Sequence, residues 1–424
     1  MSAFCEDDRQ LERYPNGLIG KPRPKGEPFI RCLQWGDKAD LPWDDRDRTF
    51  DSVQDLTASL STSRSRLRVV LLPLAPQQHD ADEAQQFRAL FRHYSVPSAV
   101  PAERMRNVSH AFGASRVLGE SEVEIAWFHF LCRNVFVDES GAIRDLGYLQ
   151  DDHKAGVCKD PSMLWIMCDF FLHVEPAGWG LDGEKVVTLL CFGAPSEVVE
   201  HFQRLLGNRA WSDITEEPYL LFEVLFNDLH EVYDQAVWKL SRAVNPAERE
   251  AVQRAGDLGK YGRDFSDFSF RHLNNIQKNC VFMVEAGAAS IATLDAISAK
   301  LKLKQDLSPS PLTAAAADAI EYRRRNFHST SLRLHSVEQR ILNVVQMTRT
   351  MVTQADSAVL KADSRAMKFI AALTLIFLPA TGVASVFDTP FFDNDFSVSR
   401  IRVATNFWVF WAVDTEYAGV MGFA

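Results

Sequence analysis

The sequence FIAALTLIFLPATGVASVF, residues 369–387, decides the fold of this 424-residue chain. These nineteen consecutive residues carry no formal charge. As an α-helix they would be about 29 Å long, which matches the hydrocarbon thickness of a lipid bilayer. Lys361, Arg365 and Lys368 come just before, and basic residues typically flank the cytoplasmic end of a membrane span. We therefore predict a transmembrane helix at 367–387, the alternative being a buried core helix.

An apolar repeat runs through the residues that precede the predicted span. Its steps alternate between three and four residues, which is typical of a helix seam that packs against other helices. The repeat predicts a long helix over 311–366 that continues into the membrane. This helix is either a stalk that bundles with copies of itself or an ordinary long core helix. The seam consists of Leu334, Val337, Ile341, Val344, Thr348, Met351, Ala355, Ala358 and Ala362.

The C-terminal sequence resembles that of the CorA-type magnesium transporters over roughly residues 364–413. The matching features are Met367-Lys368 before the span, Leu378-Pro379 and Thr381 within it, and the aromatic Phe387 at its end. A brief loop and a second apolar segment then follow. The resemblance implies a cytoplasmic α/β domain, a long stalk helix, and a homopentamer in the lipid membrane whose pore is lined by the first span.

The outer end of the span departs from the family pattern. CorA-type transporters carry Gly-Met-Asn there, whereas this chain has Asp388-Thr389-Pro390, and fungal-type members are similar in having a divergent tripeptide. Pro390 lacks a donor N–H and fixes the turn. Asp388 would form a ring of carboxylates in an oligomer, which attracts cations by charge. The chain is expected to be a divergent, fungal-like member to which magnesium selectivity does not carry over.

Resemblance and helical spacing together predict which residues line the pore. The transported ion would be Mg²⁺ or another divalent cation, flowing passively, and the same ion is a possible regulator from the cytoplasmic side. Met367 and Leu378 would form apolar constrictions that gate by dewetting, and Asp388 would stand at the mouth. Ile370 and Ser385 fit lipid-facing or helix-packing roles equally well. The predicted pore face consists of Met367, Ile370, Thr374, Leu378, Thr381, Ser385 and Asp388.

Residues 219–243 predict an amphipathic helix with an acidic face. It contains the sequence HEVYD at 230–234, in which Asp234 stands where the zinc-protease pattern H-E-x-x-H needs its second histidine, so a protease is not expected. Acidic helix faces are usually solvated. In the family that the chain resembles, such faces bind regulatory divalent cations between subunits, and on that ground Glu231 and Asp234 are candidate regulatory ligands.

Composition excludes several classes of protein. A net charge of −10 argues against general nucleic-acid binding, which needs a basic face. Seven scattered cysteines predict reduced thiols and a cytosolic N-terminal domain. Core residues rather than a zinc site are predicted for the irregularly spread His129, Cys132, His153, Cys158, Cys168 and His173. With no Gly-rich phosphate loop and no nucleophile–base set, neither an enzyme nor a covalently bound cofactor is expected.

The remaining segments complete the predicted architecture. Apolar runs at 67–74, 122–137, 163–174 and 186–192 predict strands, and helices are expected at 81–94, 196–206 and 272–303. The fold class is an α/β cytoplasmic domain followed by a stalk helix and a two-span membrane region whose second span is short or incomplete. The predicted divisions are a polar leader at 1–60, the α/β domain at 61–210, cytoplasmic helices at 211–310, the stalk at 311–366, the first span at 367–387, a loop at 388–402 and the second span at 403–424.

Two classes of function follow from this architecture. One is a CorA-like channel for divalent metal cations. The other is a non-transporting, membrane-anchored scaffold or regulatory relative on the same fold, which the altered tripeptide and the short second span favour.

Overall fold

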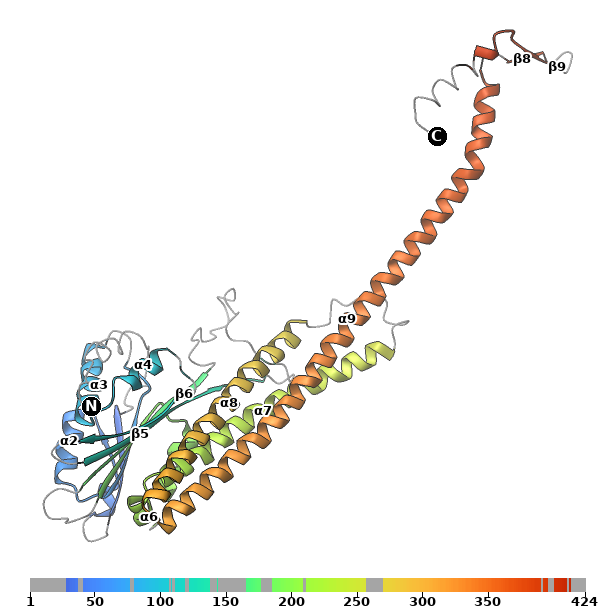
Figure 1. Cartoon of the computed structure of the whole chain (residues 1–424). Coiled ribbons are helices and arrows are strands. Elements are labelled where there is room, and N and C mark those ends of the chain that lie inside the picture. Colours follow the sequence, from blue (N-terminus) through green and yellow to red (C-terminus); the bar gives the residue numbers. More distant parts are fainter. Residues whose placement is uncertain are drawn as a thin grey trace. The chain divides into compact units, whose positions relative to one another are not determined.

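The structure, a computed structural model, divides the chain into two compact units, Met1–Met347 and Thr348–Ala424, which are described separately below. The first unit is an α/β domain, a seven-stranded sheet with helices on both faces (Figure 1). The residues that the structure describes are 28–36, 41–76, 80–106, 108, 111–118, 122–137, 143, 165–176, 185–208, 211–256, 270–389, 392–395, 400–409 and 412.

The sheet has the strand order β2-β1-β3-β7-β6-β5-β4. β3 and β7 are parallel, and all other neighbouring strands are antiparallel. Every residue of β3 is buried, as expected for a strand covered on both faces, and this is why its sequence is a continuous apolar run. The strands are β1 (Ile30–Trp35), β2 (Asp47–Phe50), β3 (Leu67–Leu72), β4 (Phe112–Leu118), β5 (Glu122–Arg133), β6 (Trp165–Pro176) and β7 (Lys185–Phe192).

The predicted polar leader, residues 1–60, contains part of the sheet. The strands β1 and β2, the short 3-10 helix η2 (Trp43–Asp45) and most of α2 (Val53–Thr62) lie within it, whereas residues 1–27 lie outside the described residues. Polar residues interrupt the apolar pattern of β1, but each has a partner. Arg31 pairs with Asp47 on β2 at 2.6 Å, and the buried Gln34 accepts a hydrogen bond from Ser63 Oγ at 2.7 Å. The strand β1 could not be predicted from the local sequence, because its polar side chains form their hydrogen bonds with residues that are distant along the chain.

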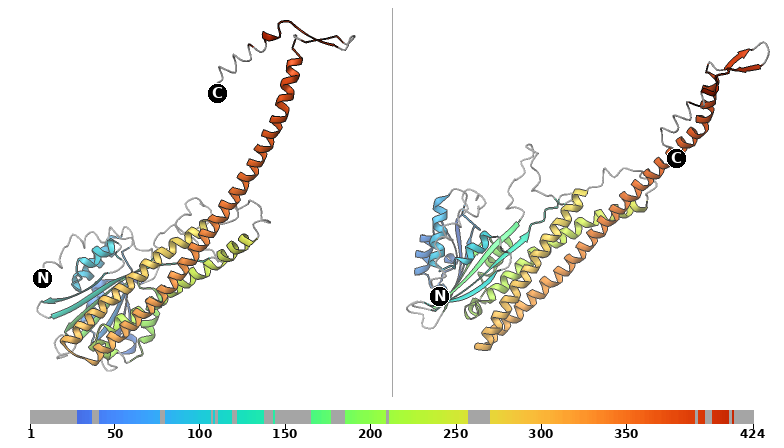
Figure 2. Two further views of the ribbon diagram at one scale, coloured as in Figure 1. Left: turned by 45° about the vertical axis from the view of Figure 1, so that its right-hand side comes forward. Right: turned by 45° about the horizontal axis from the view of Figure 1, so that its top comes forward.

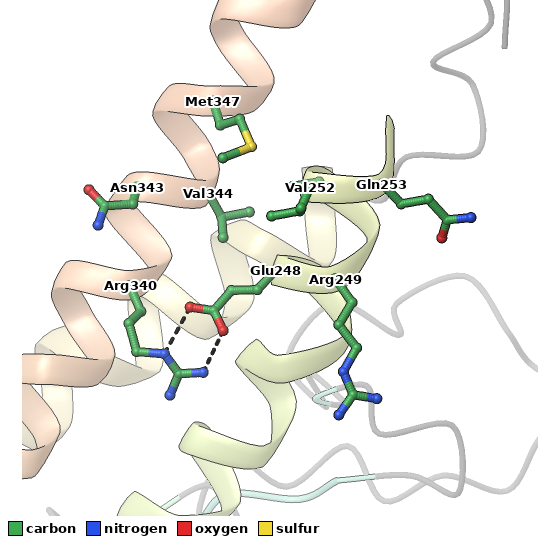
Figure 3. A pocket seen from close by; sticks show the side chains of 9 residues that line it. Glu248, Arg249, Val252, Gln253, Arg340, Asn343, Val344 and Met347 are labelled. Carbon is green, nitrogen blue, oxygen red and sulfur yellow. Dashed lines mark hydrogen bonds and ion pairs between the residues drawn. The ribbon is translucent and has the colours of Figure 1, made fainter. Parts of the chain in front are cut away.

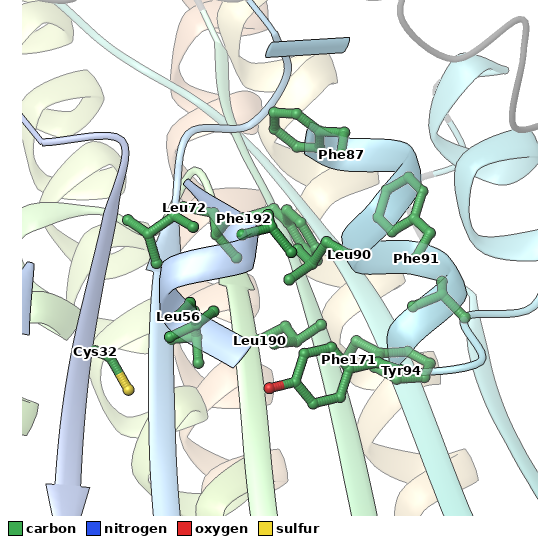
Figure 4. Packing of buried hydrophobic residues seen from close by; sticks show 14 of the residues in the cluster. Cys32, Leu56, Leu72, Phe87, Leu90, Phe91, Tyr94, Phe171, Leu190 and Phe192 are labelled. Atoms are coloured by element: carbon green, nitrogen blue, oxygen red, sulfur yellow. The ribbon is translucent and has the colours of Figure 1, made fainter. Parts of the chain in front are cut away.

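One face of the sheet is covered by α2, α3 (Ala81–His93) and α4 (Ala99–Met105). Side-chain caps fix where the first two of these helices begin: Ser52 Oγ accepts from the N–H of Asp55, and Asp80 Oδ1 accepts from the N–H of Glu83. The second cap confirms the predicted helix start at 81. The aromatic and leucine side chains of these helices fill the core against the sheet (Figure 4); they include Leu56, Phe87, Leu90, Phe91 and Tyr94, packed with Phe171, Leu190 and Phe192.

The other face is covered by the long helices. Phe128 on β5 stacks on Phe226 of α7 with ring centroids 4.8 Å apart, and Arg133 on the same strand donates to Asn279 of α8 at 3.0 Å. In all three views α7, α8 and the first part of α9 lie side by side (Figures 1 and 2). The elements are α5 (Ser196–Leu205), α6 (Trp211–Glu216), α7 (Leu220–Gly256), α8 (Phe270–Leu307) and α9 (Pro311–Phe387).

The apolar seam of α9 is used within the chain over its first part. Leu334, Val337, Ile341 and Val344 are all buried in the first unit. The buried positions extend the three-and-four spacing further back than the sequence suggested, to Thr313. The interpretation as a core helix therefore holds for this part of α9, and a stalk that bundles only with copies of itself does not describe it.

The second unit holds the remainder of α9 and a short hairpin. The hairpin pairs β8 (Phe392–Asp395) with β9 (Arg400–Val403) in antiparallel register, within the predicted loop 388–402. The last two residues of the apolar seam, Ala358 and Ala362, are exposed. Most of the predicted second span, including residues 413–424, lies outside the described residues. The five described cysteines are free and buried, which confirms the predicted core positions of Cys132 and Cys168; Cys5 and Cys158 are not described.

Candidate functional site

Two helices in the described part of the chain are long and apolar enough to cross a membrane: residues His272–Leu307 in α8 and Pro311–Val386 in α9. The apolar stretch of α8 is half buried, because it packs against the sheet and against α7. The apolar stretch of α9 has no buried residue. Burial thus distinguishes α8, a core helix, from the apolar stretch of α9, which no described part of the chain covers.

The predicted pore residues keep their spacing because α9 is helical without interruption through Phe387. At about 100° per residue, positions 367 to 388 of the predicted face fall within an arc of about 80°. Met367 and Leu378 are 71% and 67% exposed, so neither is covered by the residues that the structure describes. The structure places these side chains on one face; their role in lining a pore stays a prediction.

Two threonines on this face are bonded to their own helix. Thr374 Oγ1 donates to the carbonyl of Ile370 at 2.8 Å, and Thr381 Oγ1 donates to that of Phe377 at 2.8 Å. Pro379 lies inside the helix and lacks an N–H, so it cannot make the usual bond to the carbonyl four residues earlier. A threonine whose hydrogen is committed to the backbone still has oxygen lone pairs with which to accept hydrogen bonds or contact a cation.

The altered tripeptide lies at the end of this helix. The N–H of Asp388 donates to the carbonyl of Ala384 at 2.9 Å, so the backbone is still helical there, and the Asp388 side chain is exposed. Thr389 ends the helix by donating from its side chain to the carbonyl of Val386 at 2.5 Å. Pro390 is outside the described residues. The aspartate is therefore fixed to the last turn of α9, on the predicted pore face.

The candidate regulatory ligands lie on α7. Asp234 accepts hydrogen bonds from Thr330 Oγ1 at 2.9 Å and from Arg333 Nη1 at 2.6 Å, both on α9. Glu231 accepts from Gln235 at 3.2 Å. Arg333 neutralises Asp234, which opposes the attraction of a cation there. Among the described residues no group of three or more His, Cys, Asp or Glu side chains is arranged to hold a metal ion.

Sequence reasoning missed the arginines that pair with α7. Arg323 binds Glu223, and Arg340 binds Glu248 at 2.6 Å, in addition to the pair at Asp234. Together the three pairs attach α9 to α7 along the first unit. The sequence does show arginines recurring along α9 and acidic residues recurring along α7. These residues could be matched as ion pairs only once the two helices are known to be neighbours.

A mostly apolar groove of about 510 Å³ lies in the first unit, between the end of α7 and α9. Val252 of α7 points toward Val344 of α9, with Met347 one turn further along (Figure 3). The ion pair of Arg340 with Glu248 lies beside them.

No protein-family profile matches this chain, and no curated protein matches it. Its structure is similar to several solved structures at low identity. One is the full-length CmaX protein, with a TM-score of 0.42, 11% identity, and coverage of 94% of this chain and 97% of that one.

A second is the CorA magnesium transporter from Methanocaldococcus jannaschii, with a TM-score of 0.40, 12% identity, and coverage of 91% and 94%. A third is the ZntB cytoplasmic domain from Vibrio parahaemolyticus RIMD 2210633, with a TM-score of 0.39, 9% identity, and coverage of 78% and 100%. Likenesses at this level do not assign a function.

Proposed function

We propose that this chain is one subunit of an oligomeric membrane channel for divalent metal cations, with its N-terminal α/β unit in the cytosol. The observation that carries the proposal is the contrast along α9. Its first part buries a regular seam, whereas the stretch 369–387 is apolar and uncharged, and none of its described side chains is buried. The resemblance of residues 364–413 to the C-terminus of CorA-type transporters supports the same reading.

The uncovered stretch fits a bilayer better than water. Soluble proteins rarely expose a contiguous apolar patch larger than a few hundred Å², and a bare apolar helix about 29 Å long would exceed that. In lipid the same helix satisfies its backbone groups internally, which is the condition for crossing. Lys361, Arg365 and Lys368 lie at its N-terminal side, and basic residues favour the cytosolic side of a membrane.

A single helix cannot enclose a pore, so the proposal requires several copies around an axis; the resemblance implies five. The face that would point to the axis combines apolar constrictions with oxygen acceptors. Met367 and Leu378 would narrow the pore, and Thr374 and Thr381 present lone pairs because their hydroxyl hydrogens are already donated to the backbone. Such a surface accepts hydrogen bonds from the water shell that Mg²⁺ sheds reluctantly.

A membrane-anchored scaffold is the second candidate, and one observation favours it. The chain has Asp388-Thr389-Pro390 where the family that it resembles has Gly-Met-Asn. If that tripeptide is what recognises the hydrated ion, this chain would keep the anchor and the cytosolic unit without conducting.

Flux measurements on the purified full chain in liposomes distinguish the two candidates. A channel is expected to pass Mg²⁺, Co²⁺ or Ni²⁺ down an imposed gradient, read with an indicator inside the vesicle. Absence of flux for all three ions, from protein shown to be inserted and oligomeric, would leave the scaffold. Recovery of the chain as a soluble monomer without detergent would remove both.

Replacing Asp388 by alanine is expected to lower the flux at low salt by about ten-fold. Clefts lined by one sign of charge raise the local concentration of counter-ions by factors of ten or more. The difference should shrink as ionic strength rises, because exposed charges are screened by salt. The matched control is Asp318→Ala, which removes an exposed carboxylate from the first part of α9. Equal flux in wild type and Asp388→Ala would exclude Asp388 from the conduction path.

A further inference from the structure

Four ionisable side chains meet on the sheet face that α4 covers. Asp169 on β6 lies directly opposite His129 on β5, and α4 contributes the adjacent Glu103 and Arg104. His129 Nδ1 is 2.7 Å from Asp169 Oδ1, and His129 Nε2 is 3.0 Å from Glu103 Oε2. Arg104 Nε donates to Asp169 at 2.7 Å and its Nη2 donates to the carbonyl of Cys168 at 3.0 Å.

The contacts around His129 favour a ring that carries two protons. Ionised carboxylates only accept hydrogen bonds, and a neutral imidazole has a single N–H to donate. Because each ring nitrogen faces a carboxylate oxygen, both contacts are hydrogen bonds only when the ring carries two protons. A neutral His129 would place a nitrogen lone pair against one of the two carboxylates. Arg104 Nη2 also faces Nδ1, but at 3.5 Å it is farther away than Asp169 Oδ1 at 2.7 Å.

Charge balance supports the same state. With His129 protonated, the cluster contains two cations and two anions. His129 and Arg104 have fully buried side chains, Asp169 is nearly so, and Glu103 is 29% exposed. These are the charged groups that α4 and β6 turn toward His129 in the described chain; from the β4 side the contact is the backbone carbonyl of Ala111, which accepts from the His129 N–H at 3.3 Å.

We propose that the second proton on His129 clamps α4 to the sheet, and that its loss at alkaline pH releases α4. The contact that breaks is the one between His129 and Glu103, because Glu103 is the more exposed carboxylate and lies on the seven-residue helix α4. Asp169 stays paired with Arg104. The clamp belongs to the cytosolic unit and does not depend on whether the chain conducts ions.

Two histidines on this sheet face provide an internal comparison. Burial lowers the pKa of His129, but the charge and hydrogen bond of Asp169 and the hydrogen bond of Glu103 outweigh it, so the net pKa is raised. Burial lowers the pKa of His173 to about 4, helped by His93 and Arg68. Since the His129 pKa is raised on folding, the clamp is fully present below the ordinary histidine value and is lost as pH rises through the folded pKa.

The first test measures both histidines in the full chain. Exchange of the imidazole C2 hydrogen with deuterium, followed by mass spectrometry over a pH series, gives a titration midpoint for each ring. His129 is expected to titrate above about 6.5 and His173 well below it. A His129 midpoint at or below the ordinary histidine value would overturn the proposal.

The second test links the proton to α4. Backbone deuterium uptake of residues 99–106, corrected for intrinsic exchange, is expected to rise about ten-fold across the His129 midpoint in wild type. Glu103→Gln removes one negative charge while keeping the side-chain shape, so it should lower the His129 midpoint by about one pH unit and move the α4 transition with it. Glu200→Gln, an exposed change on α5, should move neither. If the His129 midpoint shifts while the pH dependence of deuterium uptake by α4 stays the same, the proton on His129 does not keep α4 on the sheet.

Discussion

Asp169→Asn is expected to destabilise the α/β unit by about 3–5 kcal/mol, the cost of breaking a buried ion pair by removing one partner. The asparagine keeps the shape but leaves the buried guanidinium of Arg104 without its carboxylate. At about 2–4 °C per kcal/mol, thermal unfolding of the purified chain in detergent, followed by circular dichroism, should shift down by roughly 10 °C.

Asp47→Asn is the matched control for this change. It also removes the carboxylate from an Arg–Asp pair of the same sheet, with Arg31, but those side chains are each 34% exposed. Exposed pairs contribute about 1 kcal/mol at most, so the unfolding temperature should fall by a few degrees or less. Equal decreases in unfolding temperature for the two variants would mean that burial does not increase the contribution of the Asp169 pair to stability.

The same pair also sets an acid limit on stability. Burial raises the pKa of Asp169, but Arg104 and His129 outweigh it, so the net pKa of this carboxyl is lowered. The stabilisation is therefore present above the unfolded value, about 3.9, and is lost as pH falls through the folded pKa. Acid unfolding of Asp169→Asn should depend less on pH in this range than acid unfolding of wild type.

Gly287→Ala is expected to destabilise the helical bundle by about 1–3 kcal/mol, although alanine is the better helix former by about 1 kcal/mol. A Cβ at position 287 of α8 would lie 2.2 Å from the hydroxyl of Tyr233 and 2.8 Å from its Cζ. Tyr233 cannot move freely, because its ring stacks on Phe327 of α9 and its hydroxyl donates to the carbonyl of Met283. The unfolding temperature of the full chain provides the measurement.

Two further variants test the cause of that loss. At Gly382 in α9 an added Cβ meets nothing within 4 Å, so Gly382→Ala should not lower the unfolding temperature and should raise it slightly, because alanine is the better helix former. In a Tyr233→Phe background Gly287→Ala should cost less than in wild type, because the atom nearest the new methyl group is gone. A full, undiminished cost in that background would place the clash elsewhere.

A large part of the fold could be predicted from local sequence. The buried strands β3, β5, β6 and β7 are readable because each combines a run of apolar residues with turn-forming neighbours, and the cap of Asp80 marks the start of α3. Helical periodicity placed α7, α8 and α9. The resemblance of residues 364–413 supplied the candidate pore face, which the continuous helix keeps on one side.

Other features had no local signal. The strands β1 and β2 carry polar residues whose partners are brought in by the sheet, so their sequence indicated a loose leader. Arg104, His129 and Asp169 are far apart along the chain, and each alone indicated only a core or surface residue. The seam of α9 predicted that something would cover it, but not whether that partner was α7 and α8 or another copy of the chain.

The sequence by itself determined the long helices, the apolar segments, and that one uncharged stretch is long enough to cross a bilayer, since these properties depend on residues close together in the chain. Tertiary structure alone decided which apolar faces are covered and which charges are paired. Burial and ion pairing depend on the distances between side chains from different elements, and only the folded chain sets those distances.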